Sequence, residues 1–439
     1  MRLPKLSDAD PRVSAEGSID PLGMYSIADA LAVRLVPGVR ERQMHPRFLT
    51  AIAVSLWLCR DFDEETVAAD GVSEPWQVFE WYLVEGLVRT TTDRQRLRGL
   101  PGQDKATRAV RDGVPLSRSR YLKAPNVFGF HGVYRTLARD IGIEVAGRLG
   151  QVGYDLLTTW EKEQGLDGFI SSGDGEGNRI RRQMIEAIKD GLAAGAVARR
   201  DGWTGWNFLS DHLDIYDVGA QESRIISRAL LNDASGFRGE LLRGLVHPEG
   251  WKTWWGEVQQ RSFSERRFHE WIMSRASPQL KELLRAIDTY ERFCRLLQDA
   301  FDDCLFCMSQ NRRRVAPEEF TRLPGVRRAA RAVPRMFADV AELLSPFDQT
   351  VRFEDTFAGL AQQVPVDDWV ERLLQHHRRV QNAKAPAGKA PWFDRFDDGT
   401  CMIRTAYVTE HGGRNDDAYV HAYRTRALSS FARDLRLGG

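Results

Sequence analysis

The stretch from Ser277 to Arg314 reads SPQLKELLRAIDTYERFCRLLQDAFDDCLFCMSQNRRR. Ser277 suits the N-cap of a helix and Pro278 its first turn. Apolar side chains then recur every three or four residues, which is the period of one helix face. The stripe consists of Leu280, Leu283, Leu284, Ile287, Tyr290, Leu297, Phe301, Leu305 and Met308. We therefore predict one long helix, about 45–50 Å at about 1.5 Å per residue, that forms the spine of a helical bundle.

Helical spacing continues through most of the chain on either side of this stretch. We predict further helices over residues 30–36, 48–59, 76–88, 134–141, 154–164, 366–380 and 421–437. Only Thr400–Val408 alternates enough to predict a strand. The chain has 439 residues, of which 42% are apolar and 28% charged, as in an ordinary globular protein. The predicted fold class is mostly α: multi-helix bundle domains, a winged-helix-like unit and a small irregular C-terminal module.

Glycine- and proline-containing stretches and changes in apolar periodicity suggest four segments. Residues 1–125 form an N-terminal helical domain with a basic loop. Residues 126–172 show helix, tight turn and helix, as in a helix-turn-helix or winged helix, although helical proteins in general share this rhythm. Residues 179–380 form a helical bundle, and residues 381–439 a basic and aromatic module. The glycine-rich stretch 171–178 between them lacks a Gly-Lys-Ser/Thr sequence, so we interpret it as a linker rather than a P-loop.

The overall charge excludes a uniformly basic protein, because 62 Lys and Arg residues face 61 Asp and Glu residues, for a net charge of +1. Five cysteines are too few for a disulfide framework, which indicates a reducing compartment. We find neither a secretory leader nor an apolar run long enough to cross a bilayer. We expect a cytoplasmic protein that does not associate with membranes.

Basic residues concentrate in the segment Arg89–Lys123, where ten Lys and Arg residues face three Asp residues, a net charge of +7. Glycines and prolines interrupt this segment and its apolar periodicity is lost, so we predict an extended loop. Phosphates are the usual counterpart of so dense a positive charge, since arginine forks fit phosphate oxygens. A solvated loop, or one that pairs with an acidic patch such as Asp61–Glu65 or with an acidic partner, remains open.

A second basic segment is Arg312–Arg335, where eight Arg residues face two Glu residues, a net charge of +6. Its arginines recur at helical spacing, which places them on one face. Because the chain as a whole is nearly neutral, we expect a polarised surface of the kind that grips nucleic acid. A solvated helix face is the alternative.

The C-terminal module gathers basic and aromatic residues on glycine-bearing loops, where functional groups tend to lie. Three interpretations remain open. The module contacts phosphates and bases; or it is a metal-dependent nuclease that uses Asp394, Asp397 and Asp398 with Lys384 or Lys389; or it is a tail that packs on the bundle. The tail would pack through Trp392, Phe393, Phe396 and Tyr407.

These patterns give one set of candidate nucleic-acid contacts. It comprises Arg94, Arg96, Arg98, Lys105, Arg108, Arg111, Arg118, Arg120, Lys123, Arg327, Arg328, Arg331, Arg378, Arg379, Lys384, Lys389, Trp392, Arg404, Arg414 and Arg424. Trp203 and Trp206, flanked by Gly202 and Gly205, are predicted to be more exposed than the other tryptophans and are the candidates for base stacking. We expect no catalytic residue, metal or cofactor, since Cys304 and Cys307 fit a helix core and Asp211–Asp217 fits a polar helix cap or turn better than a metal site.

Three stretches also carry a resemblance. They are Leu35-Val36-Pro37-Gly38-Val39; Gly99-Leu100-Pro101-Gly102 with Tyr121-Leu122-Lys123, Phe128-Gly129-Phe130 and Gly132-Val133-Tyr134; and Lys384, Gly388-Lys389 and Trp392 with His421-Ala422-Tyr423-Arg424. Together they resemble an uncharacterised family of helical proteins encoded in bacterial genome-defence (anti-phage) islands. The resemblance covers about a third of the chain. It implies work alongside nucleases, helicases or methylases and carries over no catalytic residue.

The sequence thus predicts a non-catalytic, DNA-binding component of a bacterial anti-phage or DNA-processing complex, with DNA and other protein subunits as partners. A scaffold or adaptor subunit that meets an acidic protein is the first alternative. A metal-dependent nuclease is the second.

Overall fold

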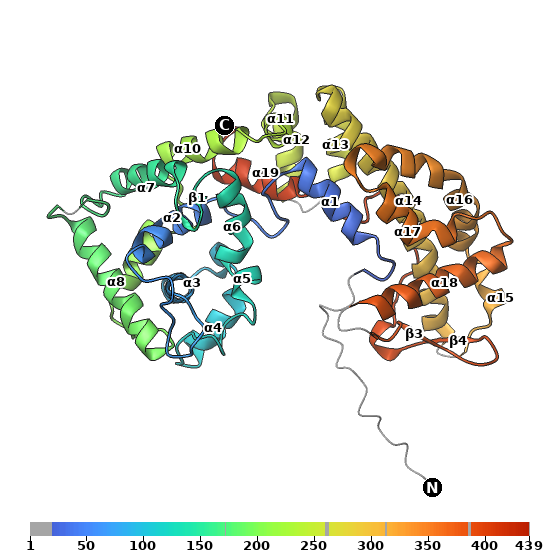
Figure 1. The fold of residues 1–439 in the computed structure, drawn as a ribbon, viewed down its shortest axis with the longest axis horizontal. Helices are drawn as coiled ribbons and strands as arrows, with labels where there is room; N and C mark the ends of the chain where they lie inside the picture. Colours follow the sequence, from blue (N-terminus) through green and yellow to red (C-terminus); the bar gives the residue numbers. More distant parts are fainter. Residues whose placement is uncertain (1–19, 172, 260–262, 312–313, 385–387, 439) are drawn as a thin grey trace, which may run out of the picture. The chain divides into compact units, whose positions relative to one another are not determined.

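A computed structural model shows a mostly α-helical chain (Figure 1). It describes residues 20–171, 173–259, 263–311, 314–384 and 388–438. The chain divides into two compact units. We call residues 20–31 with 264–422 the α14 unit, and residues 32–263 with 423–438 the α2 unit. Helix α1 (Tyr25–Leu35) runs from one into the other.

The α2 unit is built from short and medium helices. Its elements are α2 (Arg47–Cys59), α3 (Pro75–Thr90), the 3-10 turn η2 (Arg94–Leu97), α4 (Gln103–Arg111), α5 (Pro125–Phe128), α6 (Phe130–Asp140), the hairpin strands β1 (Glu144–Val145) and β2 (Arg148–Leu149), α7 (Gln151–Glu163), α8 (Glu176–Ala194), α9 (Gly205–His212), α10 (Ala220–Leu231), α11 (Phe237–Leu245), α12 (Pro248–Gln259) and α19 (Thr425–Asp434). The helices predicted over 48–59 and 76–88 are confirmed as α2 and α3.

Helix α2 is the centre of this unit, because ten of its thirteen residues are buried. It packs against α3, α6, α7 and α8. Phe48 of α2 stacks on Phe130 of α6 with the ring centroids 5.3 Å apart. Each large apolar side chain buried in this way stabilises the fold by about 1.5–3 kcal/mol. The apolar run of α2, interrupted only by Thr50 and Ser55, is therefore the signature of a helix that is covered on nearly every side.

The α14 unit is organised along one long helix. Its elements are α13 (Glu265–Met273), α14 (Pro278–Asn311), α15 (Pro317–Phe320), α16 (Pro324–Leu344), the 3-10 turn η3 (Ser345–Phe347), α17 (Thr350–Phe357), the 3-10 turn η4 (Ala358–Leu360), α18 (Val366–Ala383), strands β3 (Phe393–Arg395) and β4 (Cys401–Ile403), and the 3-10 turn η5 (Thr405–Tyr407). The predicted spine is confirmed as α14, 34 residues long. Ser277 Oγ accepts a hydrogen bond from Leu280 N (3.3 Å), as an N-cap should.

Two carboxylates of α14 accept backbone hydrogen bonds from two other parts of the unit. Asp303 accepts backbone hydrogen bonds from Gly413 (2.9 Å) and Gly325 (2.8 Å). Asp299 accepts one from the backbone of Arg414 (3.1 Å). A Cβ on Gly413 would lie 2.7 Å from the Asp299 carbonyl oxygen, so the loop fits there only because the residue is glycine. The segment after β4 is thus held against α14 by hydrogen bonds to buried or half-buried carboxylates.

Asp302, on the same helix, gives a prediction about stability and pH. Burial raises its pKa to about 6, and the charges of Asp299 and Asp303 act in the same direction against a hydrogen bond from Gln298. Between pH of about 4 and 6 the folded chain therefore binds more protons than the unfolded chain, and its free energy of unfolding falls as the pH rises. We expect Asp302→Asn to stabilise the protein by about 1–3 kcal/mol at pH 7.5 and to have little effect near pH 3.5.

Chemical denaturation at the two pH values measures this difference. Asp339→Asn, at an exposed carboxylate of α16, is the matched control and should change little at either pH. A gain for Asp302→Asn that is equal at both pH values would contradict the titration of Asp302 as its cause.

Several sequence predictions differ from the structure. Between the two main helices of residues 126–172, α6 and α7, lies the β1–β2 hairpin instead of a tight turn. The stretch 171–178 lies inside the α2 unit rather than at a boundary between units. A Cβ on Gly177 would lie 1.8 Å from the Leu166 carbonyl oxygen, so this glycine permits close packing instead of flexibility. The strand predicted at Thr400–Val408 is confirmed only in part, as β4 paired with β3.

The bounds of the two compact units are not those of the four predicted segments. The chain passes from one unit to the other after residues 31, 263 and 422, so residues 381–439 are divided between both. Their last helix, α19, packs against α11 and α12 of the α2 unit. The physical reason is that α19 buries an apolar face, including Leu428 and Phe431, in that unit.

Candidate nucleic-acid interface

The basic segment is partly helical, which corrects the prediction of an extended loop. It contains η2 and α4, and α4 packs on α3. The buried face of α4 consists of Ala106 and Ala109. Two alanines leave almost no apolar periodicity in the sequence, so the helix could not be recognised from its pattern. Gly102 precedes α4 with φ +80°, a conformation that favours glycine.

Two buried carboxylates of α3 hold this segment in place. Glu80 accepts hydrogen bonds from Tyr121 Oη (2.8 Å) and from the backbone of His131 (3.1 Å). Glu85 accepts from the backbone of Leu116 (3.0 Å) and from Arg89 Nε (2.8 Å). Burial nevertheless raises the pKa of Glu85 above its usual range, against the effect of these hydrogen bonds. Sequence analysis missed both carboxylates, and the one available signal was the spacing of Glu85 and Arg89 at i and i+4.

Tyr121 joins the end of the segment to the residues just before α4. Its hydroxyl also donates to the Pro101 carbonyl oxygen (3.3 Å). A Cβ on Gly102 would lie 2.2 Å from the Tyr121 ring, so that the ring packs directly on the residue before α4. The turn of residues 117–123 therefore lies beside the start of α4, and its cations and those of α4 share one region of the α2 unit.

The candidate cations of this region point to solvent. All are exposed: Arg96, Arg98, Lys105, Arg108, Arg111, Arg118, Arg120 and Lys123. We call these eight residues the α4 surface. The side chain of the ninth candidate, Arg94, lies outside the described part of the chain. Sequence reasoning missed helix α4, which carries three of these eight cations: Lys105, Arg108 and Arg111.

Only two of the eight pair with a carboxylate among the described residues. Arg96 binds Asp214 (2.6 Å) and Arg111 binds the adjacent Asp112 (3.0 Å). The other six side chains have no carboxylate within 4 Å in the part of the chain that the structure describes: Arg98, Lys105, Arg108, Arg118, Arg120 and Lys123. None of these six cations therefore forms a close ion pair with a described residue, although the charge of Arg118 acts on the carboxyl of Asp70. Exposed cations without close ion pairs are the electrostatic footprint expected of a phosphate-binding face.

The second basic segment, Arg312–Arg335, differs because some of its arginines bind groups within the protein. Arg312 and Arg313 lie outside the described residues. Arg328 binds the buried Asp299 (2.7 Å) and Arg327 donates to the Thr321 carbonyl oxygen (2.9 Å). Arg331, like Arg335, is exposed on α16 and makes no ion pair with a described residue. About half of this cationic face therefore holds α16 in place within the α14 unit.

The candidates near the end of α18 also include both exposed side chains and side chains with internal contacts. Arg378 and Arg379 are exposed, and Arg379 donates to the Thr356 carbonyl oxygen (2.7 Å). Lys384 donates to the Asp20 carbonyl oxygen, and Lys389 is half-buried. Trp392 stacks on Tyr407, with the ring centroids 4.7 Å apart and the planes 5° from parallel. These contacts fix the segment to its own unit.

The remaining candidates also have partners inside the protein. Arg404 binds Asp394 (2.7 Å) and Arg414 binds Asp416 (3.0 Å). Arg424 is only 9% exposed and donates to the Val39 carbonyl oxygen (2.8 Å), so it stabilises the α2 unit and is not part of a binding surface. With Phe393 also buried, the geometry favours a packed tail for residues 392–407 among the three interpretations of the C-terminal module.

The acidic residues of that module do not assemble a metal site among the described residues. Asp394 is engaged by Arg404, and Asp398 accepts from Thr400. The group of three metal-ligand types that the described residues bring together is Glu291, Cys294 and His421. Its Glu291 oxygens already accept from His421 Nδ1 (2.7 Å) and from backbone amides of residues 420 and 421. This group is a hydrogen-bonded anchor for the loop before α19.

The two other weak metal candidates, Asp211–Asp217 and the pair Cys304 and Cys307, include residues that make hydrogen bonds or pack in the core. His212 Nδ1 lies 3.0 Å from Gln164 Oε1, and Asp214 caps the turn at Tyr216 and binds Arg96. Cys304 is fully buried in the core that α14 forms, as its place in the apolar stripe predicts. Burial raises the pKa of its thiol well above the usual range, so the thiol stays protonated at neutral pH.

Comparison with protein-family models, curated proteins and solved structures finds no match to this chain. Within the described residues, no helix combines the length and the apolar character that crossing a membrane requires.

Proposed function

We propose that this protein binds DNA without acting on it chemically, and that the α4 surface is where the phosphate backbone contacts it. The observation that carries the proposal is the set of six exposed cations with no carboxylate within 4 Å among the described residues, on a segment that buried Glu80 and Glu85 hold in place. A preformed array of this kind binds phosphates without the entropic cost of ordering a loop. Because phosphates carry no sequence information, binding should depend little on sequence.

The test is the salt dependence of duplex binding by the full chain. If the six cations each neutralise one phosphate, log K should fall against log salt with a slope of about −5 for B-form DNA. Fluorescence anisotropy with a labelled duplex at about 50–200 mM salt measures the slope. Binding that is absent at low salt, or that does not respond to salt, would contradict the proposal.

A polyglutamate competitor separates DNA from an acidic protein partner. We expect DNA to bind more tightly, since arginine forks match phosphate oxygens and DNA releases condensed counterions. Polyglutamate that binds while DNA does not would instead favour the adaptor function.

The wider role follows from the sequence resemblance alone. We propose a non-catalytic subunit of a bacterial anti-phage or DNA-processing complex, because the family that the sequence resembles is encoded beside nucleases, helicases and methylases. Affinity purification of the tagged chain from its native host, with and without nuclease treatment, tests this role. Recovery of stable protein subunits after nuclease treatment is the expected result.

A further inference from the structure

We propose that a pocket next to α4 receives an unpaired nucleobase, so that the protein prefers DNA with a single-stranded segment. This inference rests on the proposed function and adds the form of DNA that the site would take. The pocket has a volume of about 430 Å³ and lies wholly in the α2 unit. Helices α3, α4 and α9 and the turn before α9 form its walls.

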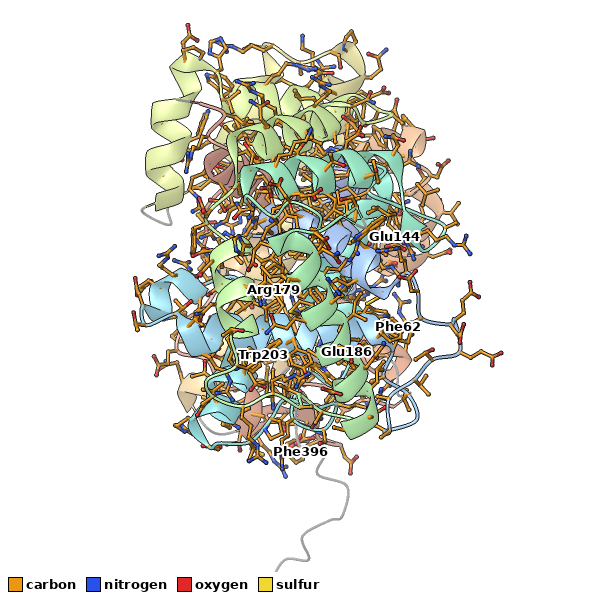
Figure 2. All side chains as sticks on the ribbon, turned by 90° about the vertical axis from the view of Figure 1, so that its left-hand side faces the viewer. Phe62, Glu144, Arg179, Glu186, Trp203 and Phe396 are labelled. Atoms are coloured by element: carbon orange, nitrogen blue, oxygen red, sulfur yellow. The ribbon has the colours of Figure 1, made fainter. Side chains whose placement is uncertain are left out.

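The aromatic wall of the pocket is packed and hydrogen-bonded within the α2 unit. Trp203 and Trp206 stand at 88° to each other with their ring centroids 4.9 Å apart. Trp206 is buried, and its Nε1 donates to the Arg200 carbonyl oxygen (2.9 Å). A Cβ on Gly205 would lie 2.2 Å from the Trp203 ring, so the ring packs on the first turn of α9. Trp203 is half-buried and lies near α8 (Figure 2), in agreement with the hydrogen bond from Gln183 Nε2 to Thr204 Oγ1 (3.0 Å).

The charge in the pocket is balanced, unlike that of the α4 surface. Arg89 binds Glu85 (2.7 Å) on one side and Asp201 on the other. Its guanidinium carbon also lies 5.1 Å from the centroid of the Trp206 ring. A phosphate would meet the Asp201 carboxylate here and gain little from an arginine that is already paired. The walls therefore suit an uncharged ligand.

The chemistry of the walls narrows that ligand to a planar heterocycle with polar edges. The half-buried ring of Trp203, which also has the Arg199 guanidinium carbon 5.8 Å from its centroid, is the aromatic group proposed to stack on the ligand. Base–aromatic stacking does not depend on which base is present. The exposed Asn207 side chain offers both a donor and an acceptor at the rim. A paired base within a duplex presents neither its face nor its Watson–Crick edge, so only an unpaired base can use both features.

Val110 of α4 lines the pocket, which places the pocket at the edge of the phosphate-binding helix. Arg111, the next residue, is exposed, as is Arg108 one turn earlier on the helix. A strand whose phosphates contact α4 can therefore turn one base into the pocket without leaving the cationic surface. Combined stacking and backbone contact of this kind is the usual way in which single strands are bound.

The experiment compares a single strand of about twelve nucleotides, oligothymidylate, with a blunt duplex of the same length, on the full chain at one salt concentration. Trp203→Leu should weaken single-strand binding at least about five-fold, which corresponds to about 1 kcal/mol of stacking, and leave duplex binding unchanged. Asn207→Phe, at an exposed position, should fill the pocket with the same selective loss, and it covers the case in which Trp203→Leu fails to fold. Trp57→Leu is the control, because Trp57 is a half-buried tryptophan of the same unit with an arginine over its ring and does not line the pocket.

The outcomes distinguish the two proposals. If the wild type binds the duplex but both pocket variants bind single strands as tightly as it does, the pocket is not a base site and the proposed function stands. If the wild type binds neither probe at low salt, both proposals fail.

Discussion

Neutralising five cations of the α4 surface is expected to weaken duplex binding by about a hundred-fold or more at about 50 mM salt. The variant replaces each of them with glutamine: Lys105, Arg108, Arg118, Arg120 and Lys123. All five are exposed, so the substitutions remove charge without disturbing the core. Each lost phosphate contact removes about 0.9 from the slope of log K against log salt, so the slope should become shallower by about 4.5.

The matched control removes five exposed cations from other helices of the same unit. The control residues are Lys162, Arg182, Lys189, Arg224 and Arg228, which lie on α7, α8 and α10. Both variants change the net charge of the protein by the same amount, so a difference between them reports where the DNA lies. Equal losses of affinity in the two variants would show that binding follows net charge and not the α4 surface.

Breaking the buried ion pair between α2 and α10 is expected to have the largest effect on stability. Arg47 and Glu222 are 1% and 0% exposed and contact each other directly. Arg47 Nη2 also donates to the His212 carbonyl oxygen (2.7 Å), and Glu222 accepts from Thr50 and from the backbone of Gly219. Burial raises the pKa of Glu222 above its usual range, although the charge of Arg47 opposes the shift.

Glu222→Ala leaves the Arg47 cation buried without its partner and should lower the free energy of unfolding by about 3–5 kcal/mol. The double variant Arg47→Met with Glu222→Leu should be clearly more stable than Glu222→Ala, because it removes both charges and keeps most of the volume. Urea denaturation of both variants measures the difference. A double variant as unstable as the single one would show that packing, and not the uncompensated charge, sets the cost.

The sequence predicts the elements whose burial is large and regular. Helix α14 has an apolar stripe along its whole length, and α2 is apolar on nearly every side, so both could be recognised from the spacing of their residues alone. Helix α4 could not, since Ala106 and Ala109 make up its buried face. The linker predicted over residues 171–178 was wrong for a related reason. A glycine needed for close packing, such as Gly177, and a glycine in a flexible linker look the same in a sequence.

The candidate site shows the same limit. A count of charges finds the basic segments, but it does not show which arginines form contacts inside the protein. Arg328 and Arg424 resemble Arg108 in the sequence, yet one binds the buried Asp299 and the other a backbone oxygen. Pairings between residues far apart in the chain decide this, and no local pattern carries them. Glu80 is another example, because its partners Tyr121 and His131 lie 41 and 51 residues away.

Protection of individual lysines from acetylation tests most directly whether DNA lies on the α4 surface. Lys105 and Lys123 belong to that surface, while Lys162 and Lys189 are exposed on α7 and α8 of the same unit. With saturating duplex at low salt, quantitative mass spectrometry should show slower acetylation of Lys105 and Lys123 and unchanged acetylation of Lys162 and Lys189. Unchanged acetylation of Lys105 and Lys123 while the duplex is bound would contradict the proposed binding surface.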